Sequence, residues 1–132
     1  MKQITVFLEN EKGRLSAVTR CLADAGINMQ ALTIAESAEY GLVRIICDKP
    51  EEALSALKVG DYRAIATDVV AIEVSNQAGG LAKLLETLDG LDLNIEYGYC
   101  FSTGQDTAID VLKIKGAEAA VEAIQAAGFK VL

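Results

Sequence analysis

An internal repeat limits what this chain can fold into more than any other feature of its sequence. The segment NEKGRL at 10–15 recurs 66 residues later as NQAGGL at 76–81, and GINM at 26–29 recurs as DLNI at 92–95. A chain of 132 residues with this repeat is predicted to contain two small domains, at residues 1–67 and 68–132. Domains of this size bury a marginal core, so each is expected to need support from the other or from a second chain.

Hydrophobic periodicity gives both halves the same order of elements. Alternating residues predict strands in the first half, and spacings of three and four predict helices. The first half has expected strands at 3–9, 27–37, 42–47 and 62–66 and expected helices at 13–25 and 48–60. The second half has expected strands at 69–75, 93–103, 107–114 and 129–132 and expected helices at 79–89 and 117–127. The order predicts two tandem ferredoxin-like βαββαβ units of the α+β class, each an antiparallel sheet with its helices on one face.

Each half contains a strand that turns through a glycine into a helix. The first N–H groups of a helix have no partner within it, and the helix dipole places positive potential there. The turns at Gly13 and Gly79 are therefore candidate sites for a carboxylate. A second interpretation remains open, in which each glycine only permits the turn and Asn10 and Asn76 bond to nearby backbone.

The paired motif resembles the ACT domain family of small regulatory domains in amino-acid metabolism. The resemblance covers essentially the whole chain as two tandem copies. It is carried by the N-x-x-G-x-L motifs at 10–15 and 76–81, together with GINM at 26–29 and LNI at 93–95. It implies a binding module whose ligand, usually an amino acid, is held where two such units meet.

The resemblance also implies which residues contact the ligand: the turn after the first strand, and the start of the second strand, often from the neighbouring unit. An Asn amide there offers a donor and an acceptor to an amino acid. The expected ligand-binding residues of the first half are Asn10, Glu11, Lys12, Gly13, Arg14, Leu15, Asn28 and Met29. Those of the second half are Asn76, Gln77, Ala78, Gly79, Gly80, Leu81, Asn94 and Ile95.

The two copies depart from each other in two ways. Asp92 stands where the first copy has Gly26, and the second turn is neutral where the first carries Glu11, Lys12 and Arg14. The two sites therefore need not be equivalent. For Lys12 and Arg14, solvated surface charge is the default interpretation. For Tyr97, Tyr99 and Phe101, which share one face of a strand, sheet packing is favoured over stacking on a ligand.

Composition argues against several classes of function. The chain has no histidine, which removes the commonest general base and metal ligand, and its three cysteines are scattered. Glu9, Glu11 and Glu36 have no evident partner, so no enzyme activity, cofactor or metal is expected. A net charge of −7 without a basic stripe makes nucleic acid and membranes poor partners. The odd cysteine count and the absence of a signal-peptide pattern favour a cytoplasmic protein.

The sequence thus predicts a free-standing sensor that binds a small amino acid or related carboxylate and regulates a partner protein, such as a metabolic enzyme, in trans. The alternative is a structural assembly module with vestigial ligand sites. A homodimer is expected through the sheet face that the helices leave open. The apolar residues placed on that face are Phe7, Leu32, Ile34, Leu42 and Ile46.

Overall fold

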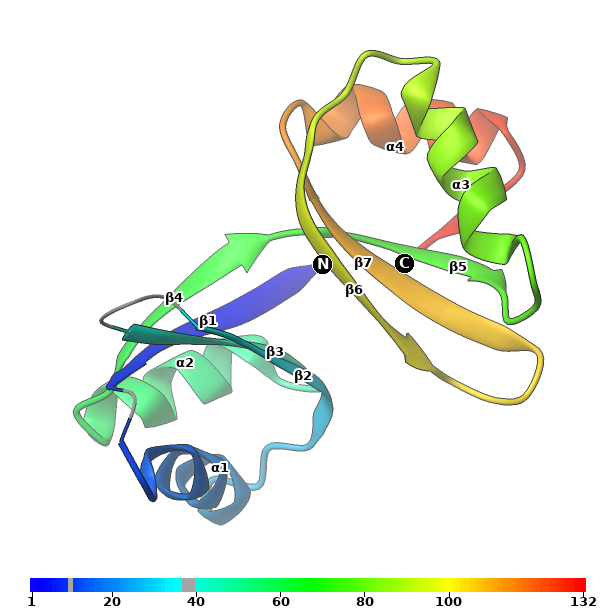
Figure 1. The fold of residues 1–132 in the computed structure, drawn as a ribbon. Helices are drawn as coiled ribbons and strands as arrows, with labels where there is room; N and C mark the ends of the chain where they lie inside the picture. Colours follow the sequence, from blue (N-terminus) through cyan, green and yellow to red (C-terminus); the bar gives the residue numbers. More distant parts are fainter. Residues whose placement is uncertain (10, 37–39) are drawn as a thin grey trace. The chain divides into compact units, whose positions relative to one another are not determined.

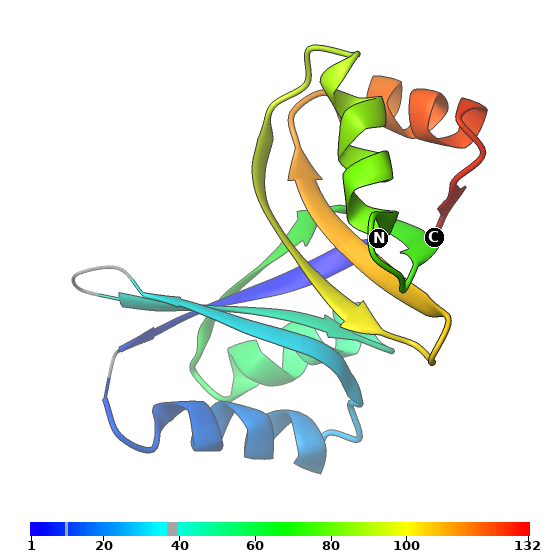
Figure 2. The same cartoon turned by 45° about the vertical axis from the view of Figure 1, so that its right-hand side comes forward.

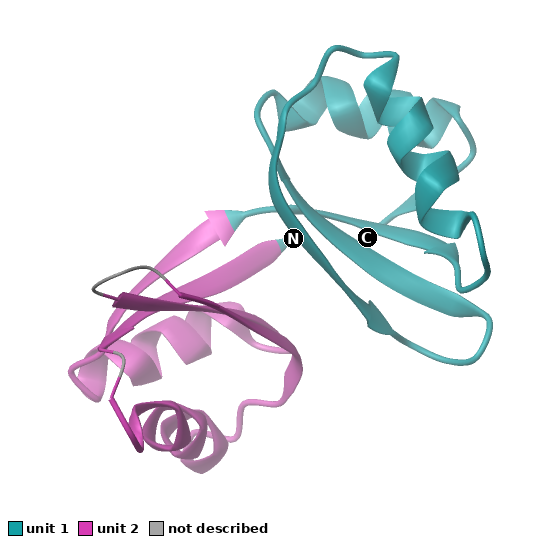
Figure 3. Cartoon of the chain, in the orientation of Figure 1, with its two compact units in different colours: residues 1, 68–132 teal, residues 2–67 magenta. Residues whose placement is uncertain are grey.

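The protein is represented by a computed structural model, which describes residues 1–9, 11–36 and 40–132. The chain divides into two compact units, coloured separately in Figure 3. Residues 2–67 form the N-terminal unit (magenta), and Met1 with residues 68–132 forms the C-terminal unit (teal). Met1 groups with the second unit because its ammonium donates to the Val69 carbonyl at 3.2 Å and its own carbonyl accepts from the Val69 amide at 3.0 Å.

The N-terminal unit has the predicted order of elements. They are β1 (Lys2–Glu9), α1 (Arg14–Asp24), β2 (Met29–Glu36), β3 (Tyr40–Cys47), α2 (Pro50–Val59) and β4 (Arg63–Asp68). The sheet order is β2-β3-β1-β4, and β3 runs antiparallel to both β1 and β2. Both helices cover the same face of this sheet (Figure 1).

The C-terminal unit repeats the arrangement. Its elements are β5 (Val70–Ser75), α3 (Gly80–Asp89), β6 (Ile95–Ser102), β7 (Thr107–Ile114), α4 (Ala117–Ala126) and β8 (Lys130–Val131). The sheet order is β6-β7-β5-β8, again with its helices on one face (Figure 2). The ferredoxin-like prediction is confirmed, and the element ends differ from the expected ones by a few residues, as is usual. Among the described residues no helix has the length and apolar character needed to cross a membrane.

The cores form where helix and strand periodicities meet. In the N-terminal unit, Val18 and Leu22 of α1 and Leu57 of α2 pack on Val6 and Ile45 of the sheet. In the C-terminal unit the corresponding core contains Leu84, Leu88, Ile124 and Ile72. These side chains are at most 1% exposed, so the buried stripe of each helix sits where the 3.6-residue period places it.

One part of the predicted open face is wrong. Strand pairing places Leu32 opposite Ile45 and Ile34 opposite Val43, and both partners point toward the helices. The register of β2 shifts between Met29 and Ala31, which reverses the alternation of the residues that follow. Leu32 and Ile34 therefore lie on the helix-covered face, at its edge, where they remain 39% and 53% exposed. Homodimerisation itself stays a prediction.

Candidate functional site

The turn between β1 and α1 is built around Gly13. Gly13 caps α1 with φ 87° and ψ −9°, a left-handed conformation that strains any residue with a Cβ. The Glu11 amide donates to the Glu9 carbonyl at 2.8 Å, and the Arg14 amide donates to the Glu11 carbonyl at 3.3 Å. Two of the backbone N–H groups that were expected to bind a ligand therefore form hydrogen bonds within the turn itself.

The Arg14 side chain extends from the first residue of α1 back to β1. Its Nη2 donates to Glu9 Oε2 at 3.0 Å, and its Nε lies 4.0 Å from Glu11 Oε2. The hydrogen bond and the charge of Glu9 raise the pKa of Arg14 above its ordinary value. Glu9 was expected to be an isolated carboxylate, and this ion pair corrects that expectation. Arg14 keeps the solvent exposure expected of it, since its side chain is 44% exposed. A guanidinium has five N–H donors, so Arg14 keeps donors for a further acceptor.

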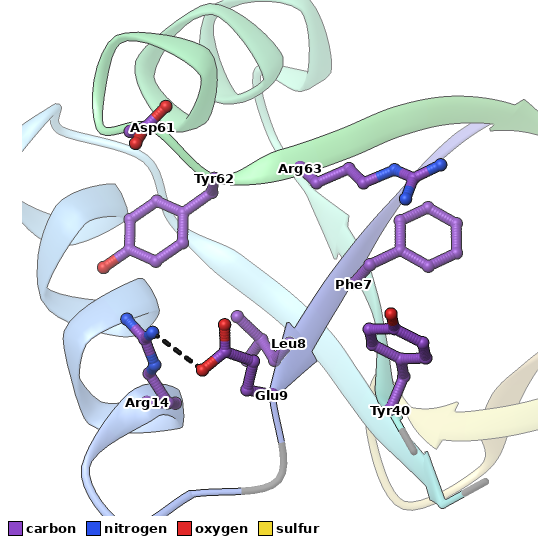
Figure 4. Close-up of a pocket in the computed structure, with 8 residues that line it drawn as sticks. All are labelled: Phe7, Leu8, Glu9, Arg14, Tyr40, Asp61, Tyr62 and Arg63. Atoms are coloured by element: carbon purple, nitrogen blue, oxygen red, sulfur yellow. Dashed lines mark hydrogen bonds and ion pairs between the residues drawn. The ribbon is translucent and has the colours of Figure 1, made fainter.

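A hollow of about 440 Å³ lies beside this ion pair, and we call it the Arg14 hollow. The Arg63 guanidinium lies over the Phe7 ring, 5.3 Å from its centroid, and Figure 4 shows the Tyr62 ring directed toward Arg14. The hollow therefore combines two guanidiniums, two carboxylates and aromatic walls within one unit. Its lining residues are Phe7, Leu8, Glu9, Arg14, Tyr40, Asp61, Tyr62 and Arg63.

Most of this lining was missed by the sequence argument. Tyr40 and Arg63 are the first residues of β3 and β4, and Asp61 and Tyr62 come from the connection between α2 and β4. The predicted fold contained a usable signal, since β4 neighbours β1 in a ferredoxin-like sheet and so brings the residues before β4 close to the end of β1. Asp61 takes φ 64°, which turns the chain out of α2 and toward the strand.

A smaller hollow of about 160 Å³ shares Leu8, Glu9 and Arg14 with the Arg14 hollow, and we call it the Val43 hollow. It brings together three of the predicted residues, Glu11, Arg14 and Leu15, with the end of the sheet. Its full lining is Leu8, Glu9, Glu11, Arg14, Leu15, Ile34, Gly41 and Val43. Lys12 is exposed and lines neither hollow, and Asn10 lies outside the described residues.

Asn28 and Met29 lie at the opposite end of α1 from Gly13. The helix has 11 residues, so the two ends are separated by about 16 Å. The backbone N–H of Asn28 donates to Asp48 Oδ1 at 3.0 Å, while Met29 packs against the core. One amino acid cannot contact both Gly13 and Asn28 of the same unit.

The turn of the C-terminal unit has a different construction. Gly79 caps α3 with φ 89°, as Gly13 caps α1, and the Gly80 amide donates to the Gln77 carbonyl at 3.0 Å. A Cβ on Gly80 would lie 2.1 Å from the Ser75 carbonyl oxygen, so only glycine fits there. Asn76 follows the backbone interpretation, because its Nδ2 donates to the Gln105 carbonyl at 3.2 Å.

The remaining predicted residues of this unit are spread between two places. Ala78 and Leu81 are exposed beside the turn, Leu81 by 46%. Asn94 is exposed just before β6, and Ile95 packs against the core, so both lie at the other end of α3 from Gly79. The two halves of the predicted site are therefore separated in this unit as well.

Asp110 of β7 is a functional candidate that the sequence argument did not name. It pairs with Ile72 of β5, a core residue under the helices, and it is only 4% exposed. Its Oδ2 is buried and has no hydrogen-bond partner among the described residues. Burial raises the pKa of the Asp110 carboxyl, because a dry environment disfavours the charged form. The sequence of β7 alone does not show that this acid faces the core, because an acidic residue in a strand usually faces solvent.

Comparison with known proteins gives a consistent assignment. The sequence model of a family described as ACT domain pair matches residues 1–131. Protein BT0572 from Bacteroides thetaiotaomicron is 38% identical, with a TM-score of 0.94 over 99% of this chain and 90% of that chain. The ligand-free regulatory subunit of aspartate kinase from Thermus thermophilus is 21% identical, with a TM-score of 0.70 over 96% of this chain and 92% of that one. No curated protein matches the chain.

Proposed function

The chain belongs to the ACT domain family as a tandem pair, and from this premise we propose that it is a regulatory protein that binds a small amino acid or related carboxylate. The observation that carries the proposal is the Arg14 hollow. It places guanidinium and carboxylate groups around a space of about 440 Å³, which is ample for one amino acid.

The charges of the hollow match those of a zwitterion. The donors that Arg14 keeps beside its bond to Glu9, together with Arg63, suit a carboxylate. The Glu9 carboxylate suits an ammonium group, and Phe7 and Tyr62 provide apolar surface for a side chain. The site thus offers a partner to each part of an amino acid, which supports binding and not catalysis.

We propose that the output is regulation of a metabolic enzyme in trans, in the cytoplasm. Proteins of the same fold from Thermus are regulatory subunits of aspartate kinase, which supports a separate regulatory chain of this kind. We further propose that the protein is a homodimer through the open sheet face. Of the residues first assigned to that face, Phe7 and Leu42 pair with each other there and are partly exposed, whereas Ile46 is only 1% exposed. Sedimentation that shows only a 14.0 kDa species at micromolar concentration would contradict the dimer.

A thermal-shift screen against the twenty amino acids tests the binding. A ligand at 100 times its Kd stabilises the folded state by about 2.7 kcal/mol, which is readily measured. Arg14→Gln should weaken binding of the amino acid found by at least tenfold, whereas Arg20→Gln, on the same helix but outside both hollows, should not. A protein that binds none of the twenty would favour the assembly module instead.

Asn28 and Asn94 are tested separately, because they lie away from the turns. Loss of a hydrogen bond to a charged group costs roughly 1.5–3 kcal/mol. If a second copy of the chain brings these residues to the ligand, Asn28→Ala or Asn94→Ala should weaken binding about ten- to a hundredfold, at about 1.4 kcal/mol per decade. If calorimetry finds the double variant as tight as wild type, these two residues are not ligand contacts.

A further inference from the structure

The Arg14 hollow has a second cation, Arg63, which is anchored at a different point from Arg14. Arg14 is held by Glu9, whereas Arg63, the first residue of β4, lies over the Phe7 ring. Glu9 and Phe7 are two residues apart on β1, so their Cα atoms lie about 7 Å apart and their side chains leave the strand on the same side. Figure 4 shows the two guanidiniums on either side of the Glu9 side chain.

The two guanidiniums also differ in the groups that neighbour them. Arg14 Nη2 lies 3.0 Å from Glu9 Oε2, so an acid already offsets this cation. Within the described part of the chain Arg63 forms no ion pair, not even with Asp61, the other acid of the hollow. Its contact with the face of the Phe7 ring leaves the N–H groups at the edge of the guanidinium able to donate. Arg63 is therefore a positioned cation that can still bind an acceptor.

The C-terminal unit contains the neutralised form of the same arrangement. Lys130 is the first residue of β8, as Arg63 is of β4. Its strand partner is Glu73, the repeat equivalent of Phe7, and Lys130 Nζ lies 3.3 Å from Glu73 Oε2. In the N-terminal unit a phenylalanine thus stands where an acid would neutralise the cation, and the positive charge of Arg63 remains available at the hollow.

Two cations that are anchored apart favour a ligand with two carboxylates. A single carboxylate bound to Arg14 would leave the donors of Arg63 to water. An amino acid with a second carboxylate on its side chain can offer one to each guanidinium, while its ammonium group meets the Glu9 carboxylate. A basic amino acid would instead bring a further cation to Arg63 and be repelled.

We propose that Arg63 determines the specificity of the Arg14 hollow, whose ligand is an acidic amino acid, aspartate or glutamate, with its α-carboxylate on Arg14 and its side-chain carboxylate on Arg63. The proposal rests on the proposed function and deepens it, because it names the class of amino acid and assigns its selection to a residue of β4, outside the repeated motif. The volume of about 440 Å³ accommodates either acid.

The test is calorimetry on the full chain with L-glutamate against L-glutamine and L-aspartate against L-asparagine, because each amide has the shape of its acid without the second charge. We expect one acid to bind about tenfold more tightly than its amide, the lower end for a hydrogen bond to a charged group. Arg63→Gln should remove this preference, and so should Phe7→Glu, which copies the C-terminal unit. Arg14→Gln should weaken acid and amide alike. Arg20→Gln, an exposed arginine of α1 outside both hollows, is the control and should keep the preference.

The outcomes separate this inference from the proposed function. If acid and amide bind equally, or if the preference survives Arg63→Gln, the inference is overturned while the function stands. The same holds if neither acid binds but another of the twenty amino acids does, whereas failure of all twenty overturns both. Arg63 is exposed, so its variants are expected to fold, and an unchanged unfolding midpoint verifies this. Arg63→Lys keeps the charge and should keep the preference.

Discussion

The two units share one fold but place opposite chemistry at the same corner of it. In the N-terminal unit, α1 begins with Arg14, whose cation bonds to Glu9, and the strand position below is Val43. In the C-terminal unit, α3 begins with Gly80, and the strand residue equivalent to Val43 by pairing is the buried acid Asp110. The comparison teaches that strand pairing and helix packing fix the backbone of both units, whereas substitutions at two equivalent positions give the units different charged groups.

The largest expected effect tests the construction of the second turn. Gly80→Ala should destabilise the C-terminal unit by about 3 kcal/mol, the upper end of the cost of overpacking, because its Cβ would meet the Ser75 carbonyl oxygen at 2.1 Å. Urea unfolding followed by residue-resolved hydrogen exchange measures this change. Gly104→Ala is the control, since open space surrounds that position. Equal stability of the two variants would contradict the close approach.

The second prediction concerns the difference between Asp110 and its counterpart Val43. Asp110→Val copies Val43 into the C-terminal unit and should stabilise that unit by about 1–3 kcal/mol at neutral pH, the usual penalty of a buried unsatisfied group. Thermal unfolding measures the gain. A variant less stable than wild type would mean that the Asp110 carboxyl has a partner in the folded protein.

The third prediction concerns the pH dependence of the same pair of proteins. The raised pKa of Asp110 means that the folded state binds this proton more tightly than the unfolded chain. Wild-type stability should therefore fall, relative to Asp110→Val, as pH rises from the ordinary value of 3.8 to the raised pKa, and the difference should then stay constant. A difference that is flat across this window, or that changes in the other direction, would show that burial does not raise this pKa.

The smallest effect concerns a left-handed residue in the connection after the first helix of each unit. Asp92 has φ 54°, where its counterpart Gly26 has φ 73°. A left-handed conformation costs a residue with a Cβ roughly 1–2 kcal/mol, so Asp92→Gly should stabilise the C-terminal unit by about 1 kcal/mol after the entropy of glycine is deducted. Denaturant midpoints measure it. Gly26→Asp should have the opposite sign in the N-terminal unit.

Local sequence patterns predicted the scaffold well. The alternation of Ile4, Val6 and Leu8 identified β1 and its buried face, and Gly13 and Gly79 take the left-handed conformation of a tight turn. These features depend on residues near one another in sequence, which is why periodicity and turn chemistry found them. Because these patterns repeat, the order of elements in the first unit also predicted the order in the second unit.

The features that the sequence did not predict depend on strand register and on contacts across the sheet. The irregularity after Met29 moved Leu32 and Ile34 to the other face, because one shifted residue reverses every later side chain. The approach of Arg63 to Phe7 joins positions 56 residues apart. The sequence does not distinguish Asp110 from a solvent-facing acid of a strand. Only its pairing with Ile72 places it on the face that packs against the helices.

The close approach at Gly80 also limits how the two turns can be engineered: Arg14 can be replaced by glycine, but Gly80 cannot be replaced by arginine. A designer can remove the Arg14 side chain with a single substitution, because a smaller residue at position 14 creates no clash with the backbone. The reverse change has no single-step route, since any residue placed at Gly80 must first displace the carbonyl of Ser75. Libraries meant to redirect ligand preference in the C-terminal unit should therefore leave Gly80 unchanged and vary Gln77, Ala78 and Leu81, which are exposed around it.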